Sequence, residues 1–110
     1  MTIDIKDFEK MDMRTGKVVK VQDFPEARKP SYKICVDFGE DLGKRWSVVQ
    51  ATNYEKEELM SMDVIAVVNL PSKNIAGFKS QILLLGALGK NNKLSLLTPS
   101  KPTKAGEKVF

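Results

Sequence analysis

Apolar and polar residues along this chain alternate or cluster in short runs, a pattern that predicts strands rather than long helices. One run alternates with a period of two, typical of a strand with one buried face, and its apolar members are Tyr32, Ile34, Val36 and Phe38. The most apolar run lies at residues 63–70, and we expect that strand in the centre of a sheet. Further strands are predicted at residues 14–21, 46–50, 80–87 and 94–97.

Two short helices are predicted beside these strands. Residues 3–11 place apolar side chains on one helical face and acidic residues near the positive N-terminal end. Thr52 and Glu55 fit a capping box, with Thr52 at the N-cap and Glu55 three residues later. The helix that they open is expected to end near Met60.

Prolines and glycines divide the chain into its elements. They predict loops at residues 23–30 and 72–79 and a hairpin turn at 39–43. The residues after Pro99 are expected to form a loose, lysine-rich tail. Gly16 lies early in the first strand, where a missing side chain permits a bulge or the close approach of another segment.

The order of these elements predicts an all-β protein with short helices. Five or so strands with a helix between the third and fourth are typical of the five-stranded Greek-key barrel called the OB-fold, here preceded by an N-terminal helix. An SH3-like barrel is the main alternative. The 110 residues are enough for one domain, which we place at residues 1–110, and they contain no repeats.

Composition narrows the function. Hydrophobic residues make up 42% and charged residues 29%, as in a globular protein, and no apolar run is long enough for a membrane span. No signal peptide is recognised, so we expect a cytoplasmic protein without membrane insertion. Histidine is absent and Cys35 is the single cysteine, so no Ser-His or Cys-His pair and no cysteine-built metal site can form. These absences favour a binding protein without metal or cofactor over an enzyme, with Cys35 in a structural role.

Charge is unevenly distributed along the chain. Residues 1–58 carry 11 Lys or Arg against 12 Asp or Glu, whereas residues 59–110 carry seven Lys against two acids. A basic C-terminal half is typical of proteins with an anionic partner such as nucleic acid. A solvated lysine surface without a partner is the alternative.

The predicted loop at residues 72–79 holds the first candidate site. Lys73, Lys79 and Ser80 surround Gly77, and their ammonium, hydroxyl and backbone groups can cradle an anion. Asn69 precedes the loop and offers an amide to a base edge or a peptide bond. Alternatively, Asn69 and Ser80 tie the loop to neighbouring strands.

Arg28, Lys29 and Lys33 form a second basic group, in which Arg28 can stack on a base or grip a carboxylate in bidentate fashion. The alternative for Arg28 is a solvated position at a hairpin tip. Arg14 lies on the first strand, where an OB-fold presents side chains to its ligand. Alternatively, Arg14 pairs with Asp12 or Asp37.

Aromatic residues are few. Phe24 and Phe78 fall in predicted loops, so we expect them to be exposed platforms for a stacked base or an apolar peptide. Tyr32, Phe38 and Trp46 lie in predicted strands and are expected to fill the barrel.

Several stretches resemble a known family. Residues 13–19 are similar to the "D-x-R-x-G-x-[IV]" opening of tRNA-binding domains, which occur in structure-specific tRNA-binding proteins, methionyl-tRNA synthetases and EMAP-II-like cytokines. Residues 67–80 resemble that family's "V-x-N-L-x-P-x-K-x-x-G-x-x-S" segment. Residues 24–33, 37–39 and 47–52 are similar to the CsaA export-chaperone branch. The resemblance covers roughly residues 7–110.

The resemblance implies an OB-fold that forms a homodimer. It also implies binding of tRNA-like nucleic acid in the wider family and a chaperone role towards exported preproteins in the CsaA branch. We therefore expect a chaperone-like protein that binds preprotein peptides in clefts on a homodimer. A tRNA-binding module acting through the basic face is the alternative.

An apolar segment favours the same assembly. Both alternating sets of residues 82–85 are apolar, so we expect both faces of this strand to be covered. The barrel covers one face, and either a second copy of the chain or the helix at 54–60 covers the other.

Overall fold

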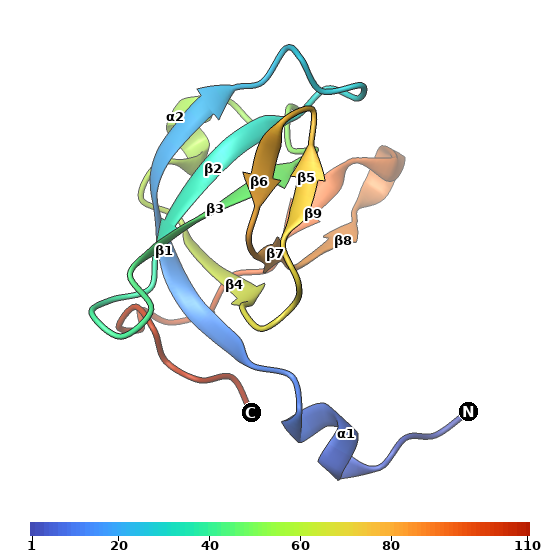
Figure 1. The fold of residues 1–110 in the computed structure, drawn as a ribbon, viewed down its shortest axis with the longest axis vertical. Helices are drawn as coiled ribbons and strands as arrows, with labels where there is room; N and C mark the ends of the chain where they lie inside the picture. The colour runs from blue at the N-terminus through green and yellow to red at the C-terminus, as the bar shows by residue number, and fades with distance from the viewer.

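The computed structural model describes all of residues 1–110 as a small antiparallel barrel (Figure 1). Its main sheet has five strands in the order β3-β2-β1-β4-β7. The N–H of Gln81, just before β7, donates to the carbonyl of Trp46 on β3 at 2.8 Å, so the sheet nearly closes on itself. The strands are β1 (Met13–Asp23), β2 (Tyr32–Asp37), β3 (Lys44–Val49), β4 (Asp63–Val67) and β7 (Leu83–Leu84). This arrangement confirms the predicted OB-fold.

The core lies inside the barrel. The alternating side chains of β2 point into it, and Ile34 and Val36 are completely buried there. Gly16 allows β1 to approach them, because a Cβ at this position would lie 2.5 Å from Val36 Cγ1 and 2.8 Å from Phe38 Cε1. A register shift between Val18 and Lys20 marks a β-bulge three residues later. The approach predicted at Gly16 is therefore present, but it is made by core side chains, and the bulge lies further along the strand.

The two helices are shorter than expected. α1 (Ile5–Glu9) has no buried residue, so the apolar face predicted over residues 3–11 does not reach the core. α2 (Lys56–Leu59) is capped by Glu55, with Glu58 completing the capping box, so the prediction of Thr52 as N-cap is wrong. The helix starts later because Tyr54 is held in a turn: its N–H donates to Ala51, and its carbonyl accepts the Tyr32 hydroxyl.

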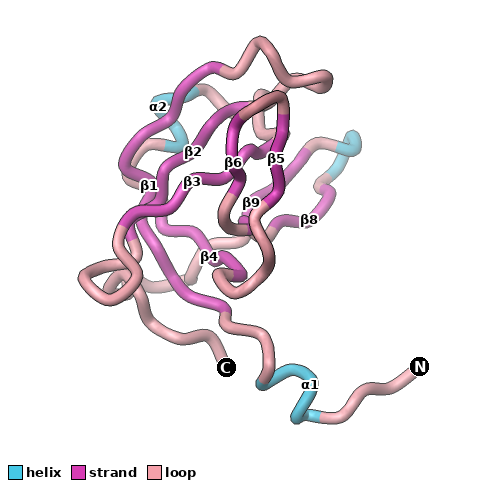
Figure 2. The backbone as a smooth tube through the Cα atoms, viewed as in Figure 1, coloured by secondary structure: helices cyan, strands magenta, loops and turns pink.

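The segment predicted as a loop at residues 72–79 is a β-hairpin. β5 (Lys73–Ile75) pairs with β6 (Phe78–Ser80) in a separate two-stranded sheet that lies over β3 (Figure 2). Ala76 and Gly77 form its two-residue turn, and both have positive φ angles, 48° and 85°. Turns of this kind match the twist of the two flanking strands, so two residues are enough to connect them.

Two predicted strands also differ in the structure. The strand expected at 80–87 divides into β7 and β8 (Gly86–Leu88), and β8 pairs with β9 (Leu94–Leu96) across a 3₁₀ turn at Lys90–Asn92. The division occurs at Leu85, whose N–H bonds to Ile65 while its carbonyl accepts from Leu97. β4 ends at Val67 and lies beside β1, which is itself the central strand of the sheet.

The C-terminal tail, predicted to be loose, lies along β1. The N–H of Thr15 donates to Glu107 at 2.9 Å, and the N–H of Gly106 donates to Thr15 at 2.7 Å. β2 begins its pairing with β1 only at Lys17, so one edge of residues 13–16 is free for the tail. No helix in the structure is long and apolar enough to cross a membrane.

Candidate ligand-binding cleft

A cleft of about 810 Å³ opens between the β1–β2 loop (residues 24–31) and the β5–β6 hairpin. The loop and the hairpin turn lie together at the upper end of the molecule in Figure 1. Val48 and Gln50 of the β3 end contribute from the barrel. The lining residues are Ala27, Arg28, Lys29, Ser31, Val48, Gln50, Lys73, Asn74, Ile75 and Ala76. OB-folds use this face and these two loops for oligonucleotides and oligosaccharides.

The charged residues in the cleft are all basic. Arg28 and Lys29 line it from the loop and Lys73 from the hairpin, and no carboxylate is among the lining residues. These three exposed residues belong to the predicted basic groups, which the fold brings together from two distant parts of the chain. Their combined field favours an anionic ligand.

Two other residues of the predicted anion cradle lie differently. Lys79 is exposed but does not line the cleft. Ser80 accepts a hydrogen bond at its Oγ from the N–H of Val48 at 3.1 Å, so it ties the hairpin to β3. The structure therefore favours the structural alternative for Ser80.

Lys33 lies in an aromatic cluster outside the barrel. Its Nζ is 4.6 Å from the ring centroid of Phe24 and 4.5 Å from that of Phe78. Phe24 is only 4% exposed and Phe78 is half-buried, so the prediction of two exposed platforms is wrong. Trp46, predicted inside the barrel, instead packs edge-on against Phe78, with the centroids 5.6 Å apart.

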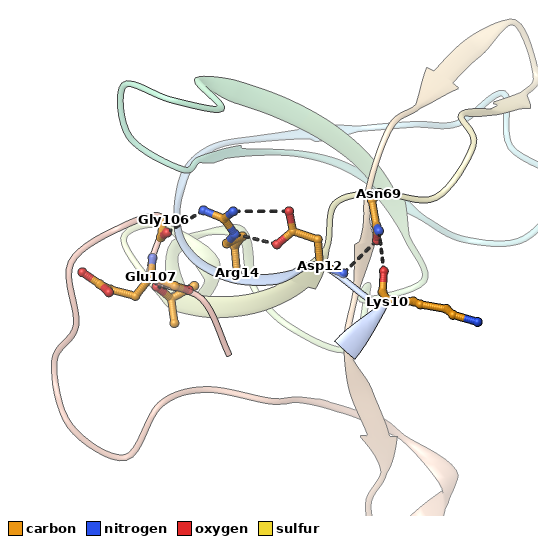
Figure 3. A network of polar contacts seen from close by, with 7 residues as sticks. Lys10, Asp12, Arg14, Asn69, Gly106 and Glu107 are labelled. Carbon is orange, nitrogen blue, oxygen red and sulfur yellow. Dashed lines mark hydrogen bonds and ion pairs between the residues drawn. The ribbon is translucent and has the colours of Figure 1, made fainter. Parts of the chain in front are cut away.

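Arg14 and Asn69 belong to one polar network around the start of β1, and neither lines the cleft (Figure 3). The Arg14 guanidinium donates to both carboxylate oxygens of Asp12, at 2.6 and 3.3 Å, and to the carbonyl of Gly106. Asn69 accepts from the Asp12 N–H and donates to the Lys10 carbonyl. Both side chains make structural bonds, as their alternatives stated.

Electrostatics agrees with this assignment. The hydrogen bonds from Arg14 lower the pKa of the Asp12 carboxyl below its ordinary value.

Burial raises the pKa of the Cys35 thiol, which keeps it protonated and unreactive. No group of three or more potential metal ligands occurs in the structure.

An apolar surface lies beside the cleft, with which it shares Val48 and Gln50, and is formed by the end of β3 and by β7, β8 and β9. Leu83 is 50% exposed and Leu88 is 73% exposed, and both line a shallow hollow with Val49 and Leu94. We call this the leucine surface. The α2 helix does not cover it, because Leu59 of that helix is turned into the core. The expectation that both faces of residues 82–85 are covered is therefore not met within one chain.

Sequence reasoning identified the basic residues of the cleft but missed most of its uncharged lining. Ile75 and Ala76 lie in the predicted loop, but two residues ending in glycine between Ile75 and Phe78 are a hairpin signal. Ser31 and Gln50 carry no motif of their own. They enter the cleft only because the barrel places the ends of β2 and β3 beside the hairpin.

The structure defines an OB-fold protein with a basic cleft beside its β1–β2 loop. The sequence model of the putative tRNA binding domain family matches residues 13–108. This chain belongs to that family, as the resemblance in its sequence predicted.

Individual relatives point to two branches of the family. The methionine–tRNA ligase of Pyrococcus furiosus is 41% identical over 108 residues, which cover 97% of this chain but 14% of the relative. The CsaA chaperone structure from Picrophilus torridus is 44% identical with a TM-score of 0.94, covering 99% of this chain and 100% of that one. The CsaA structure from Bacillus anthracis is 37% identical with a TM-score of 0.93, covering both chains completely. The relatives are thus an enzyme, the ligase, and two proteins named as chaperones.

Proposed function

We propose that this protein is a CsaA-like chaperone that binds unfolded segments of exported preproteins in the cleft between residues 24–31 and the β5–β6 hairpin. The observation that carries the proposal is the mixed lining of that cleft. Four of its ten residues are hydrophobic, and its charged residues are basic. The match to CsaA structures over the whole chain supports the same function.

An unfolded polypeptide offers groups for each part of this lining. Its apolar side chains can pack against Val48 and Ile75, and its unpaired backbone groups can bond to Ser31, Asn74 and Gln50. An apolar patch flanked by a few polar groups is the usual composition of a binding site. This binding needs no metal and no cofactor, and we propose no enzymatic step.

The proposed assembly is a cytoplasmic homodimer of the single domain 1–110. The uncovered leucine surface supports it, because large exposed apolar surfaces are uncommon on monomers. A two-fold axis through Leu83 and Leu88 would bury the surface against itself. The dimer would carry two clefts, which raises the effective affinity for a long ligand.

Binding of tRNA is a second candidate, favoured by a different observation. Arg28, Lys29 and Lys73 converge on the cleft without a carboxylate, which suits a phosphate backbone. Membership of the tRNA-binding domain family supports this candidate.

Salt dependence separates the two functions. We would titrate the protein with reduced, carboxymethylated α-lactalbumin as the unfolded polypeptide, and with purified tRNA, at 50 and 300 mM NaCl. Burial of apolar groups is nearly independent of salt, whereas tRNA affinity falls steeply with salt because releasing the counterions of the phosphates becomes less favourable. Tight polypeptide binding at both concentrations supports the chaperone. Binding of tRNA without any polypeptide binding would overturn it in favour of the second candidate.

Two variants of strand β5 sharpen the comparison. Ile75→Ser removes an apolar lining group and should weaken polypeptide binding more than tRNA binding. Lys73→Gln removes a charge and should weaken tRNA binding more. Because both residues lie on one short strand, each variant controls for disturbance of the hairpin by the other.

A further inference from the structure

The aromatic cluster around Lys33 joins parts of the molecule that the barrel alone would leave apart. Phe24 opens the β1–β2 loop, and Phe78 opens strand β6 of the hairpin. Their ring centroids are 5.9 Å apart in an edge arrangement, and the Lys33 ammonium lies within 4.6 Å of both. One wall of the cleft therefore touches the other through this cluster.

The hairpin has few other attachments. β5 and β6 pair only with each other. Its hydrogen bonds to the barrel lie at the end of β6 away from the turn, where the Val48 N–H donates to the Ser80 hydroxyl and Gln81, the next residue, exchanges two hydrogen bonds with the backbone of Trp46. Nearer the turn, the hairpin meets the rest of the molecule through the aromatic contacts of Phe78.

We propose that Lys33 is a positioning residue, whose ammonium bridges Phe24 and Phe78 and so holds the two walls of the cleft at the separation that a ligand needs. The effect on binding rests on the proposed function, whereas the effect on the hairpin does not. A cation over an aromatic face is attracted by the negative face of the ring, most strongly when it is shielded from water. The Lys33 ammonium makes two such contacts, one with Phe24 on the loop wall and one with Phe78 on the hairpin wall.

This role differs from that of the other basic residues. Arg28, Lys29 and Lys73 line the cleft and are exposed, whereas Lys33 is half-buried and not among the lining residues. Its charge is directed to the rings. Loss of Lys33 should therefore change the position of the hairpin rather than remove a contact to the ligand.

The protein contains its own reporter for this movement. Trp46 is the single tryptophan, and its ring packs 5.6 Å from that of Phe78. If the hairpin moves away, Trp46 becomes more exposed, and its emission shifts to the red and is quenched more strongly by acrylamide.

The test compares three variants by Trp46 fluorescence and by the two titrations described above. Lys33→Met keeps the length of the side chain but removes its charge, Lys33→Arg keeps the charge, and Lys79→Met removes a lysine from the same hairpin outside the cluster. We expect Lys33→Met to shift and expose Trp46 and to weaken ligand binding about tenfold, as the loss of a shielded cation–π contact would. For tRNA binding by Lys33→Met, the slope of log affinity against log salt should equal that of the unchanged protein, because no phosphate contact is lost. Lys33→Arg should keep the Trp46 fluorescence and the ligand affinity of the unchanged protein, and Lys79→Met should leave Trp46 fluorescence unchanged.

Several results would overturn the proposal. One is unchanged Trp46 emission and quenching in folded Lys33→Met. Another is a tRNA salt slope lower by about one with unchanged fluorescence, which would make Lys33 a direct phosphate contact. If Lys33→Met does not fold, Phe24→Leu replaces it, because it removes one ring of the bridge without touching Trp46, and unchanged fluorescence there refutes the bridge equally. If neither tRNA nor polypeptide binds the unchanged protein, the proposed function fails while the fluorescence still decides the role of Lys33.

Discussion

Lys73 and Lys79 project from opposite faces of the β5–β6 hairpin, although only a tight turn separates their strands. Lys73 pairs with Ser80, and Asn74 pairs with Lys79. Paired residues share a face of a hairpin, and consecutive residues alternate between faces. Lys73 therefore shares one face of the hairpin with Ser80, and Lys79 shares the other face with Asn74. Lys73 lines the cleft, whereas Lys79 does not.

This relationship predicts unequal roles for the two lysines in tRNA binding. Lys73→Gln should weaken tRNA binding and lower the slope of log affinity against log salt by about one, because one phosphate contact is lost. Lys79→Gln serves as the matched control and should change neither quantity. Filter binding at four salt concentrations measures both slopes, and equal losses in the two variants would contradict the assignment.

The leucine surface predicts the oligomeric state. Sedimentation equilibrium at micromolar concentration should give a mass of two chains for the unchanged protein. Leu83→Asp and Leu88→Asp should each give one chain, because a buried carboxylate without a partner is strongly unfavourable at an interface. Met60→Asp changes an exposed apolar residue elsewhere and should remain a dimer. A mass of one chain for the unchanged protein would refute the dimer and the two-cleft arrangement.

The ion pair of Asp12 and Arg14 predicts a pH-dependent stability difference. The pKa of the Asp12 carboxyl is lowered in the folded protein, chiefly by the hydrogen bonds from Arg14. Its contribution to stability is therefore complete above the ordinary value of 3.8 and is lost as the pH falls through the lowered value. Both side chains are about a quarter exposed, so we expect Asp12→Asn to cost only about 1 kcal/mol at pH 7.

Urea unfolding between pH 2 and 7 checks this expectation. The difference between Asp12→Asn and the unchanged protein should be constant from pH 5 to 7 and should shrink below pH 3.8. Asp4→Asn alters an exposed carboxylate without an ion pair and should show no difference at any pH. A difference that persists undiminished at pH 2 would mean that the ion pair is not its source.

The contact of Gly16 with the core predicts a larger effect. A methyl group at this position would overlap Val36 and Phe38, whose side chains are almost completely buried. Gly16→Ala should therefore lower the free energy of unfolding by about 1–3 kcal/mol. Gly89→Ala is the control, because a Cβ there meets its nearest neighbour at 3.4 Å and the backbone is extended. Equal stability of the two variants in urea would show that β1 can shift to accept the methyl group.

Elements with a strong local pattern could be predicted, and elements made by long-range contacts could not. β2 has a clear period of two, and the structure gives it the predicted start. The run from Ile82 to Leu85 is uniformly apolar, so no period marked the point where β7 ends. The β5–β6 hairpin is short and largely polar, and its place over β3 depends on Ser80 and Phe78 meeting residues some thirty positions earlier in the sequence.

The candidate site shows the same limit. Arg28, Lys29 and Lys73 could be predicted as candidates from their charge alone, because Lys and Arg side chains lie on the surface in almost any fold. Which lysine of the hairpin lines the cleft depends on how the hairpin is placed against the barrel and the β1–β2 loop, which the predicted loop did not define. Lys33 could be predicted only as a cation, since the rings on either side of it come from residues 9 positions before and 45 positions after it.

The pairing of the tail with β1 determines where further polypeptide can be attached. The tail runs beside the start of β1, and in Figure 1 both termini leave the barrel at the end opposite the hairpin turn and the β1–β2 loop. A protein fused to either terminus would therefore extend away from the cleft and leave it accessible.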